Sequence, residues 1–343
     1  MPPPIDRRSL LLAAAMPISR SLPDRPFRVA FGSCMNQREP QPIWEAVLDF
    51  QPELFVFTGD NVYGDVSSAE CLELQEAYRI AREVPGLQRL RRTVPHVATW
   101  DDHDYGGNDA GADAIWRAHA QVLFCDYWNL PSDDLRRSRV GVYSSIMLGE
   151  APFRLQFVLL DTRSFKSAWR PTDEPGARGK EQYLPDDDPS KTVLGPAQWA
   201  WLEDVLQVPA SLRIVVSSMQ VLSDAHGFER WGLLPLERTK LIGTLRKASG
   251  DVLFLSGDRH FGAIYRRADL DARPLVEVTS SGINMVYEGV DEAREPDPHR
   301  LGGPYAAPNF GTLEIQRGQV AIAIRDSTGW KVRSVIMPIA HPD

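Results

Sequence analysis

The sequence predicts an α/β fold in which two mixed β-sheets pack against each other with helices on the outside. Short apolar runs, each ended by glycine or small residues, alternate with segments of helical periodicity, and this alternation is typical of α/β domains. The runs at 143–148 and 153–160 surround a short turn and predict an antiparallel pair, so parallel and antiparallel strands are mixed. No linker divides the chain, and we expect one domain over residues 27–343.

The individual elements follow from these patterns. Strands are expected where the chain is apolar or alternating for a few residues, at 27–34 (ending in a loop), 54–57, 94–100, 143–148, 153–160, 212–217, 252–255, 276–279, 312–315 and 320–324. Helices are expected where apolar residues recur every three or four positions, at 42–50, 70–80, 86–92, 112–128, 196–206 and 236–248. Two segments rich in proline, glycine and charge, 165–194 and 289–306, predict long loops, and long loops in compact domains are often functional.

Composition narrows the class of protein. The chain has 343 residues, 43% hydrophobic content and a formal net charge of −8, which is ordinary for a globular enzyme. The acidic balance argues against a general nucleic-acid binder, because such proteins concentrate lysine and arginine. Three cysteines do not suggest a disulfide framework; Cys71 and Cys125 fall in helical patterns and are expected to be packing residues.

The N-terminus resembles an export signal. Arg7 and Arg8 precede a short apolar stretch at 10–16, which is the pattern of a twin-arginine signal. We expect residues 1–26 to be this signal and the protein to be periplasmic or extracellular; the alternative is an N-terminal tail or short helix on a cytoplasmic protein. No run of about 18 apolar residues predicts a transmembrane anchor.

Chemistry-bearing side chains gather at the ends of the predicted strands. In open α/β sheets, ligands bind beyond the carboxyl ends of the strands. Five strand ends carry such groups: Cys34; Asp60, Asn61 and Tyr63; Asp102 and His103; Arg163; Asp258 and His260. One such end could be a plain turn, but five at one sheet edge would be costly as unpaired buried groups without a metal or an anion.

The same segments resemble a known family. Gly32-Ser-Cys34, Gly59-Asp-x-x-Tyr-Gly-Asp65, Trp100-Asp-Asp-His-Asp104, Leu160-Asp-Thr-Arg163 and Ser256-Gly-Asp-Arg-His260 are similar to the motifs of PhoD-type alkaline phosphatases and phosphodiesterases. These belong to the calcineurin-like metallophosphoesterases. The resemblance implies a four-layer α/β/β/α sandwich with a two-metal centre. It covers residues 28–324 and leaves no room for the small N-terminal β domain of many PhoD proteins.

The resemblance also implies two metal sites. Asp60 would bridge both metals, and Cys34, Tyr63 and His260 would complete a site for Fe³⁺. Asp102 and Asp258 would make the second site rich in carboxylates, which suits Ca²⁺, with Mg²⁺ as the alternative. The histidine that the wider superfamily carries after the 212–217 strand is replaced by Ser218-Met-Gln220, so the oxygen that completes this site stays open.

The remaining site residues would handle the substrate. His103 would act as general acid, or would merely cap its loop. Arg163 and Arg259 would bind phosphoryl oxygens, because guanidinium fits them in a bidentate way; either could instead pair with a local carboxylate. Asn61 would contact the substrate or, like Asp101, serve as a further ligand.

The resemblance therefore implies hydrolysis of phosphomonoesters, phosphodiesters or both, by a hydroxide activated between two metals. A phospholipase D-like diesterase and a non-catalytic binding protein on a degenerate scaffold are the alternatives. We expect a small phosphate ester as the partner and a monomeric protein.

Overall fold

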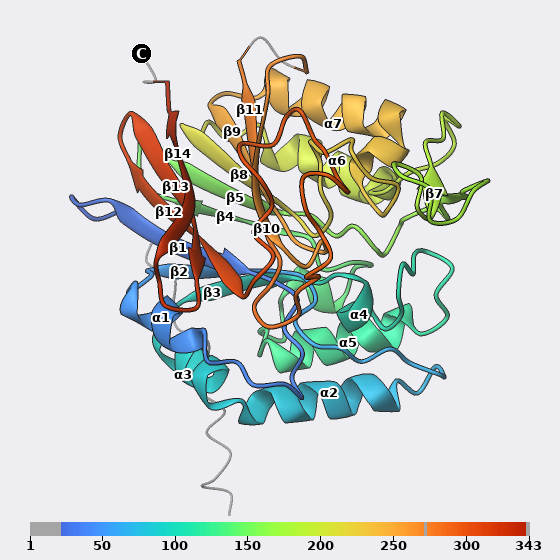
Figure 1. Cartoon of the computed structure of the whole chain (residues 1–343). Helices are drawn as coiled ribbons and strands as arrows, with labels where there is room; N and C mark the ends of the chain where they lie inside the picture. Colours follow the sequence, from blue (N-terminus) through green and yellow to red (C-terminus); the bar gives the residue numbers. More distant parts are fainter. Residues whose placement is uncertain (1–21, 271–272, 341–343) are drawn as a thin grey trace, which may run out of the picture.

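Two six-stranded sheets lie face to face in the computed structural model, which describes residues 22–270 and 273–340 (Figure 1). The first sheet has the order β14-β13-β12-β1-β2-β3. Its strands are β1 (Phe27–Gly32), β2 (Leu54–Thr58), β3 (His96–Thr99), β12 (Asn309–Gln316), β13 (Gln319–Asp326) and β14 (Lys331–Pro338). Because β1, β2 and β3 are parallel and the other three are added antiparallel, the sheet is mixed as expected.

The second sheet has the order β10-β11-β9-β8-β5-β4, with four parallel strands in the middle and an antiparallel strand at each edge. Its strands are β4 (Ser144–Leu148), β5 (Leu155–Leu159), β8 (Leu212–Ser217), β9 (Asp251–Ser256), β10 (Gly262–Arg267) and β11 (Leu275–Ser280). The predicted hairpin of β4 and β5 is confirmed.

Helices cover the outer faces of the two sheets, on opposite sides of the molecule (Figure 1). On the side of the first sheet lie α1 (Trp44–Asp49), α2 (Leu72–Glu83), α3 (Pro85–Thr93), α4 (Asp102–Tyr105) and α5 (Arg117–Tyr127). On the side of the second lie α6 (Gly195–Val205) and α7 (Pro235–Lys247). Two 3₁₀ turns, η1 (Leu135–Arg137) and η2 (Trp231–Leu233), complete the helical elements of the described chain.

The alternation of side chains along each strand produces three separate cores. In β2, Phe55 and Phe57 pack outward among the helices, whereas Leu54 and Val56 face the other sheet. A third core lies between the second sheet and α6 and α7, where Val158, for example, packs with Leu202 and Leu241. The central strands β2, β5 and β8 are buried along their whole length, so their sequences are mostly apolar, and the predicted four-layer sandwich is confirmed.

The structure differs from the sequence prediction mainly at edges. Strands β10 and β14 were not predicted; β14 pairs only with β13, is mostly exposed or half-buried, and carries Lys331 and Arg333 in its first half. The helix expected at 112–128 begins only at Arg117, and two apolar residues of that segment, Ile115 and Val122, are 78% and 52% exposed. The long loop at 165–194 contains a small hairpin of β6 (Arg170–Pro171) and β7 (Tyr183–Leu184).

None of the helices in the described part of the chain is long and apolar enough to cross a bilayer. The predicted export signal falls on residues 1–26, of which 1–21 lie outside the described residues.

Close packing between two paired strands of the first sheet gives a stability test at Gly311. This residue lies opposite Phe31 in the β1–β12 pair, and a Cβ there would lie 2.1 Å from the Phe31 ring. Gly311→Ala should therefore lower the free energy of unfolding by about 1–3 kcal/mol through overpacking. The control is Gly243→Ala in α7, where nothing lies within 4 Å and alanine should stabilise the helix by about 0.5–1 kcal/mol. Urea unfolding measures both, and equal shifts in the two variants would contradict this account of the packing.

Candidate metal centre

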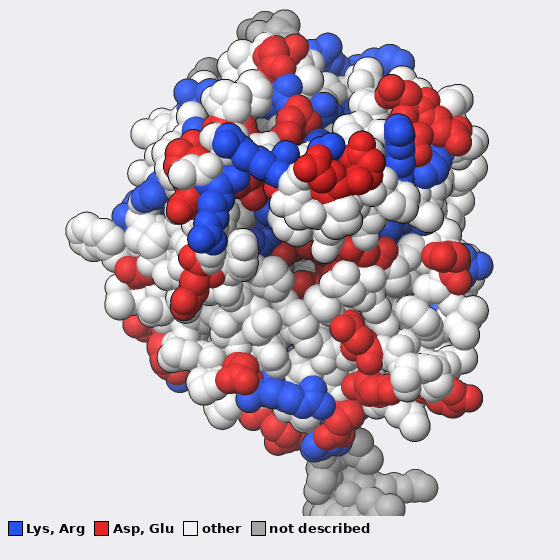
Figure 2. Space-filling model, turned by 45° about the vertical axis from the view of Figure 1, so that its right-hand side comes forward, with Lys and Arg blue, Asp and Glu red and all other residues white. Residues whose placement is uncertain are grey.

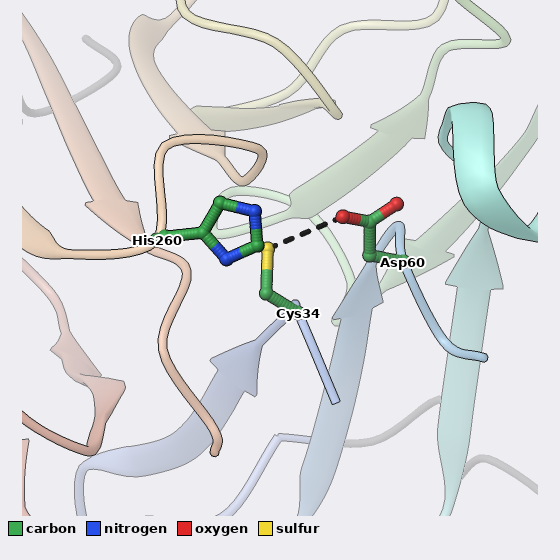
Figure 3. Close-up of side chains that lie close together, drawn as sticks. All are labelled: Cys34, Asp60 and His260. Atoms are coloured by element: carbon green, nitrogen blue, oxygen red, sulfur yellow. Dashed lines mark hydrogen bonds between the residues drawn. The ribbon is translucent and has the colours of Figure 1, made fainter. Parts of the chain in front are cut away.

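The predicted site residues follow the carboxyl ends of strands from both sheets. Cys34 follows β1, Asp60 follows β2, and Asp102 opens α4 just after β3. His260 comes from the second sheet, after β9. Figure 3 shows the side chains of Cys34, Asp60 and His260 pointing toward one another from these separate elements.

Four of these residues have backbones in the left-handed region. The φ angles are 57° at Cys34, 48° at Asp60, 68° at Asp258 and 56° at His260. Such conformations cost non-glycine residues roughly 1–3 kcal/mol each and concentrate at functional sites. The turns are also tightly packed: a Cβ at Gly59, whose φ is 108°, would lie 2.6 Å from Cβ of Asp101. The strained turns bring the side chains together where regular strands would separate them.

Cys34, Asp60 and His260 form the first candidate metal group, with their ligand atoms within 4.8 Å of one another. The Cys34 thiol donates to Oδ2 of Asp60 at 3.4 Å, and the Tyr63 hydroxyl donates to the same oxygen at 3.2 Å. Nδ1 of His260 lies 3.1 Å from the Met285 carbonyl oxygen, which can only accept. Its Nε2 therefore carries the lone pair and is available to a cation.

The second candidate group shares Asp60 with the first. It contains Asp60, Asp102 and His103, again within 4.8 Å. Nδ1 of His103 donates to Oδ1 of Asp65 at 2.7 Å, so its Nε2 is the free ring nitrogen. Asp258 belongs to none of the candidate groups found among the described residues, although it is partly buried at the same edge.

Three buried oxygens at this centre have no hydrogen-bond partner. They are Oδ1 of Asp60, Oδ1 of Asn61 and Oδ2 of Asp101. The Asn61 amide group donates to the Thr99 carbonyl at 2.8 Å and to Asp104, which leaves its oxygen unpaired. Buried acceptors are normally paired, so this set of oxygens fits a bound cation.

The charge of the centre supports the same conclusion. Burial raises the pKa of Cys34, Asp60, Tyr63 and Asp258, and the negative charges of neighbouring groups raise it further. Without a cation, these groups would resist ionisation. With a cation they become anionic ligands, because a metal favours the deprotonated form.

Asp102 and His103 differ from this pattern. Burial opposes the ionisation of Asp102, but Arg163, His103 and the backbone N–H of Asp109 outweigh it and lower its pKa to about 2. Burial likewise disfavours the imidazolium of His103, but the hydrogen bond to Asp65 and the charges of Asp60 and Asp102 raise the pKa of His103 to about 10. A charged carboxylate and a protonated imidazole thus lie side by side.

The two arginines expected to bind phosphoryl oxygens are both engaged with carboxylates. Arg163 is fully buried; its Nε donates to Asp101 at 2.6 Å, and its Nη1 lies 2.6 Å from Glu229. Arg259 is 8% exposed and pairs with Glu295 at 2.6 Å. The structure thus shows the carboxylate pairing that the sequence left open for both arginines, and the guanidinium of Arg163 lies below the surface between two acids.

Sequence reasoning missed three acids around the centre. Asp65 ends the Gly59–Asp65 motif, but no role at the site was predicted for it from the sequence. In the structure its carboxylate pairs with His103. Asp109 and Glu229 form a third group of carboxylates with Asp102, within 4.8 Å. Asp109 follows the Asp-Asp-His-Asp run closely and could have been suspected, but Glu229 lies in an irregular loop without a motif. Figure 2 shows acidic side chains at the floor of a hollow in this face of the molecule.

Comparison with known proteins agrees with the fold. The chain is 25% identical over 243 residues to alkaline phosphatase D of Bacillus subtilis (strain 168), a match that covers 62% of this chain but only 40% of that protein. A solved structure described as PhoD superposes with a TM-score of 0.71 at 18% identity, covering 92% of this chain and 68% of that one. GAP50, described as the anchor in the inner membrane complex of Plasmodium, superposes with a TM-score of 0.61 at 14% identity, covering 92% of this chain and 90% of the other.

The most extensive evidence is at the level of the family. The family model described as PhoD-like phosphatase matches residues 29–332, which include every strand end discussed above. The chain therefore belongs to the PhoD-like phosphatase family.

Proposed function

We propose that this protein hydrolyses phosphate esters at a centre of two metal ions bridged by Asp60. The observation that carries this proposal is the position of Asp60, which is shared by two groups of metal-ligating side chains and has one buried oxygen without a partner. The family supports phosphate-ester chemistry in general.

The donor atoms suit two different metals. Cys34, Tyr63 and His260 would hold an iron ion with Asp60, since thiolate, phenolate and imidazole suit Fe³⁺. Oxygens of Asp60, Asp102 and Asp258 would hold Ca²⁺ or Mg²⁺, and the unpaired oxygens of Asn61 and Asp101 are candidates to complete that site. When bound, the metals would acidify an attacking water and neutralise charge on the phosphoryl oxygens.

His103 is the proposed general acid. Asp65 fixes its ring through Nδ1, so that Nε2 carries the proton toward the leaving oxygen. The raised pKa keeps this proton in place at neutral and mildly alkaline pH. Asp65 thus orients the imidazole and stabilises its charged form, as a carboxylate partner of a catalytic histidine does.

The pairing of Arg163 and Arg259 supports phosphodiesters over phosphomonoesters as substrates. A monoester at alkaline pH carries about two negative charges, and a diester carries one. Both candidate arginines are already neutralised by buried acids, so the metals and the protonated His103 would have to offset the substrate's charge. We retain Arg163 in the site as a residue that acts through Asp101, and Arg259 as a structural pair with Glu295.

Two alternative functions predict different assay results. A phospholipase D-like enzyme would use the same centre but would hydrolyse phospholipids in preference to small diesters. A non-catalytic protein, as the anchor description of the similar GAP50 structure suggests, would hydrolyse neither. A panel of monoesters, small diesters and phospholipids, assayed together with elemental analysis of the same sample, tests the proposal. Iron with calcium or magnesium and diester turnover are expected; zinc alone at full activity would overturn the metal assignment.

Export by the twin-arginine route is also proposed, on the sequence pattern alone. Replacing Arg7 and Arg8 by lysine should keep the protein in the cytoplasm of a host with this pathway. A wild-type protein that is already cytoplasmic and retains its first residues would contradict export.

Cys34 provides the most direct test of the iron site. Cys34→Ser should remove most of the iron and of the activity, because a hydroxyl is a much weaker ligand than a thiolate. The charge-transfer colour of ferric thiolate and phenolate should weaken as well. Cys71→Ser is the matched control, since Cys71 is equally buried but remote from the centre. Equal iron content and turnover in the two variants would return Cys34 to a packing role.

His103 can be tested through the leaving group. His103→Ala should keep both metals and lose roughly 10²–10⁴-fold in kcat/KM for alkyl esters, whose alkoxide needs a proton. Nitrophenyl esters should lose much less, because nitrophenolate departs without help. If both esters lose activity by the same factor, His103 orients the bound phosphate and does not act as the acid.

The contact between Asp65 and His103 predicts that removing Asp65 shifts the pH profile of the activity. The general acid works in its protonated form, so activity falls as the pH rises through the pKa of His103. Asp65→Asn removes the partner that raises this pKa, and the alkaline limb of kcat/KM for an alkyl ester should move to lower pH. Glu73→Gln is the control, since Glu73 accepts its hydrogen bonds from the backbone N–H and the hydroxyl of Ser67 rather than from His103. An unchanged alkaline limb in Asp65→Asn would mean that His103 titrates independently of Asp65.

A further inference from the structure

Glu229 is a buried carboxylate on which three side chains converge. Its side chain is 1% exposed, although it lies in an irregular loop between β8 and η2. Oε2 lies 2.6 Å from Nη1 of Arg163, and Oε1 lies 3.2 Å from Nζ of Lys166. The indole N–H of Trp169 also donates to Oε1. Such a group costs free energy to bury, so its partners must hold it firmly.

Arg163 transmits this anchoring to Asp101. Its Nε donates to Oδ1 of Asp101 at 2.6 Å, and Nη2 pairs with the same oxygen. The Ser218 hydroxyl donates to Oδ1 as well, at 2.7 Å. All three donors thus contact one oxygen of Asp101, while its Oδ2 is buried without a hydrogen-bond partner. This Oδ2 is the oxygen proposed above as a candidate to complete the second metal site. Ser218 stands where the wider superfamily was expected to supply a histidine, so it acts here through Asp101.

The segment at 165–194 reaches the same centre by a second route. Lys166, which contacts Glu229, also donates to the Asp109 carbonyl at 2.9 Å, and Tyr183 donates to the Asp109 carboxylate at 2.6 Å. The backbone N–H of Asp109 in turn donates to Oδ2 of Asp102 at 2.8 Å. The segment is therefore connected through Glu229 to Asp101 and through Asp109 to Asp102.

The carboxylates of Asp102, Asp109 and Glu229 are close enough to hold a cation of their own. However, the cationic groups of Arg163 and Lys166 already lie against Glu229. These two cations supply the positive charge that the acids need. The cluster is better explained as a charged bridge than as another metal site.

We propose that Glu229 is a positioning residue of the second metal site. It holds Arg163 so that Arg163 and Ser218 occupy one oxygen of Asp101 and leave the other for the metal. It also binds the start of the 165–194 segment to this centre, so that the segment and the metal site keep fixed positions relative to each other. This inference rests on the proposed two-metal function.

The test measures metal affinity directly. The full chain is treated with a chelator that removes calcium, and Ca²⁺ is titrated back by calorimetry. Glu229→Gln should bind Ca²⁺ about 10–100-fold more weakly than wild type, as is usual when a partner of a metal ligand is removed. At saturating Ca²⁺, the kcat of Glu229→Gln should lie closer to the wild-type value than its Ca²⁺ affinity does, because Asp101 itself is still present.

Glu237→Gln is the matched control. Glu237 is also buried, at 6% exposed, and accepts a tryptophan N–H, that of Trp199, at 2.7 Å. It holds the other end of the same segment by accepting a hydrogen bond from the Thr192 hydroxyl at 2.7 Å. Its other hydrogen bonds come from the backbone of Val193 and Leu194 and from Trp199, not from the centre. Glu237→Gln should lower the melting temperature while leaving the Ca²⁺ affinity within about twofold of wild type.

Trp169→Phe and Trp199→Phe repeat the comparison if Glu229→Gln does not fold. Each removes one N–H donor from its glutamate, and only Trp169→Phe should weaken Ca²⁺ binding, by a few fold. Wild-type affinity in the Glu229 or Trp169 variant, or equal losses in the Glu237 or Trp199 control, would overturn the positioning role. A wild-type protein that binds neither Ca²⁺ nor Mg²⁺ would instead refute the proposed second metal site.

Discussion

The site depends on the concentration of negative charge that the two sheets bring to one edge. Asp60 lies at the centre of this charge, with the Cys34 thiol and the Tyr63 hydroxyl on one of its oxygens and no partner on the other. Carboxylates this close and this buried repel each other, and water cannot screen them. Cations would stabilise the ionised form of this arrangement. The strained turns at Cys34, Asp60, Asp258 and His260 hold the groups in place for those cations.

The sequence predicted these candidate ligands because each of them lies next to a strong local signal of secondary structure. Each candidate ligand follows an apolar run within a few residues, and a run ended by glycine identifies a buried strand without knowledge of its neighbours. The same logic predicted the parallel strands β2, β8 and β9. It failed for β14, a mostly exposed or half-buried edge strand in which Lys331 and Arg333 interrupt the apolar pattern. It also began the α5 helix at residue 112, whereas the structure begins it at Arg117.

The arginines illustrate what local signals cannot supply. The sequence left open whether Arg163 and Arg259 bind phosphate or pair with acids, and the structure pairs both. The partners Glu229 and Glu295 lie far away in the sequence, in loops without periodicity. A guanidinium between two acids and a guanidinium facing a substrate have the same sequence signature. The difference lies in long-range packing, which no motif records.

The 165–194 segment combines firmly held ends with a free tip. Its start is fixed by Lys166 and Trp169 on Glu229, and its end by Thr192 on Glu237. Between them, a Cβ at Gly176 or Gly179 would meet nothing within 4 Å. Changes at this tip can therefore accumulate without disturbing the metal ligands. Natural selection could remodel this part of the protein for new substrates while the reaction chemistry stays the same, which makes the segment a natural place for the family to diversify.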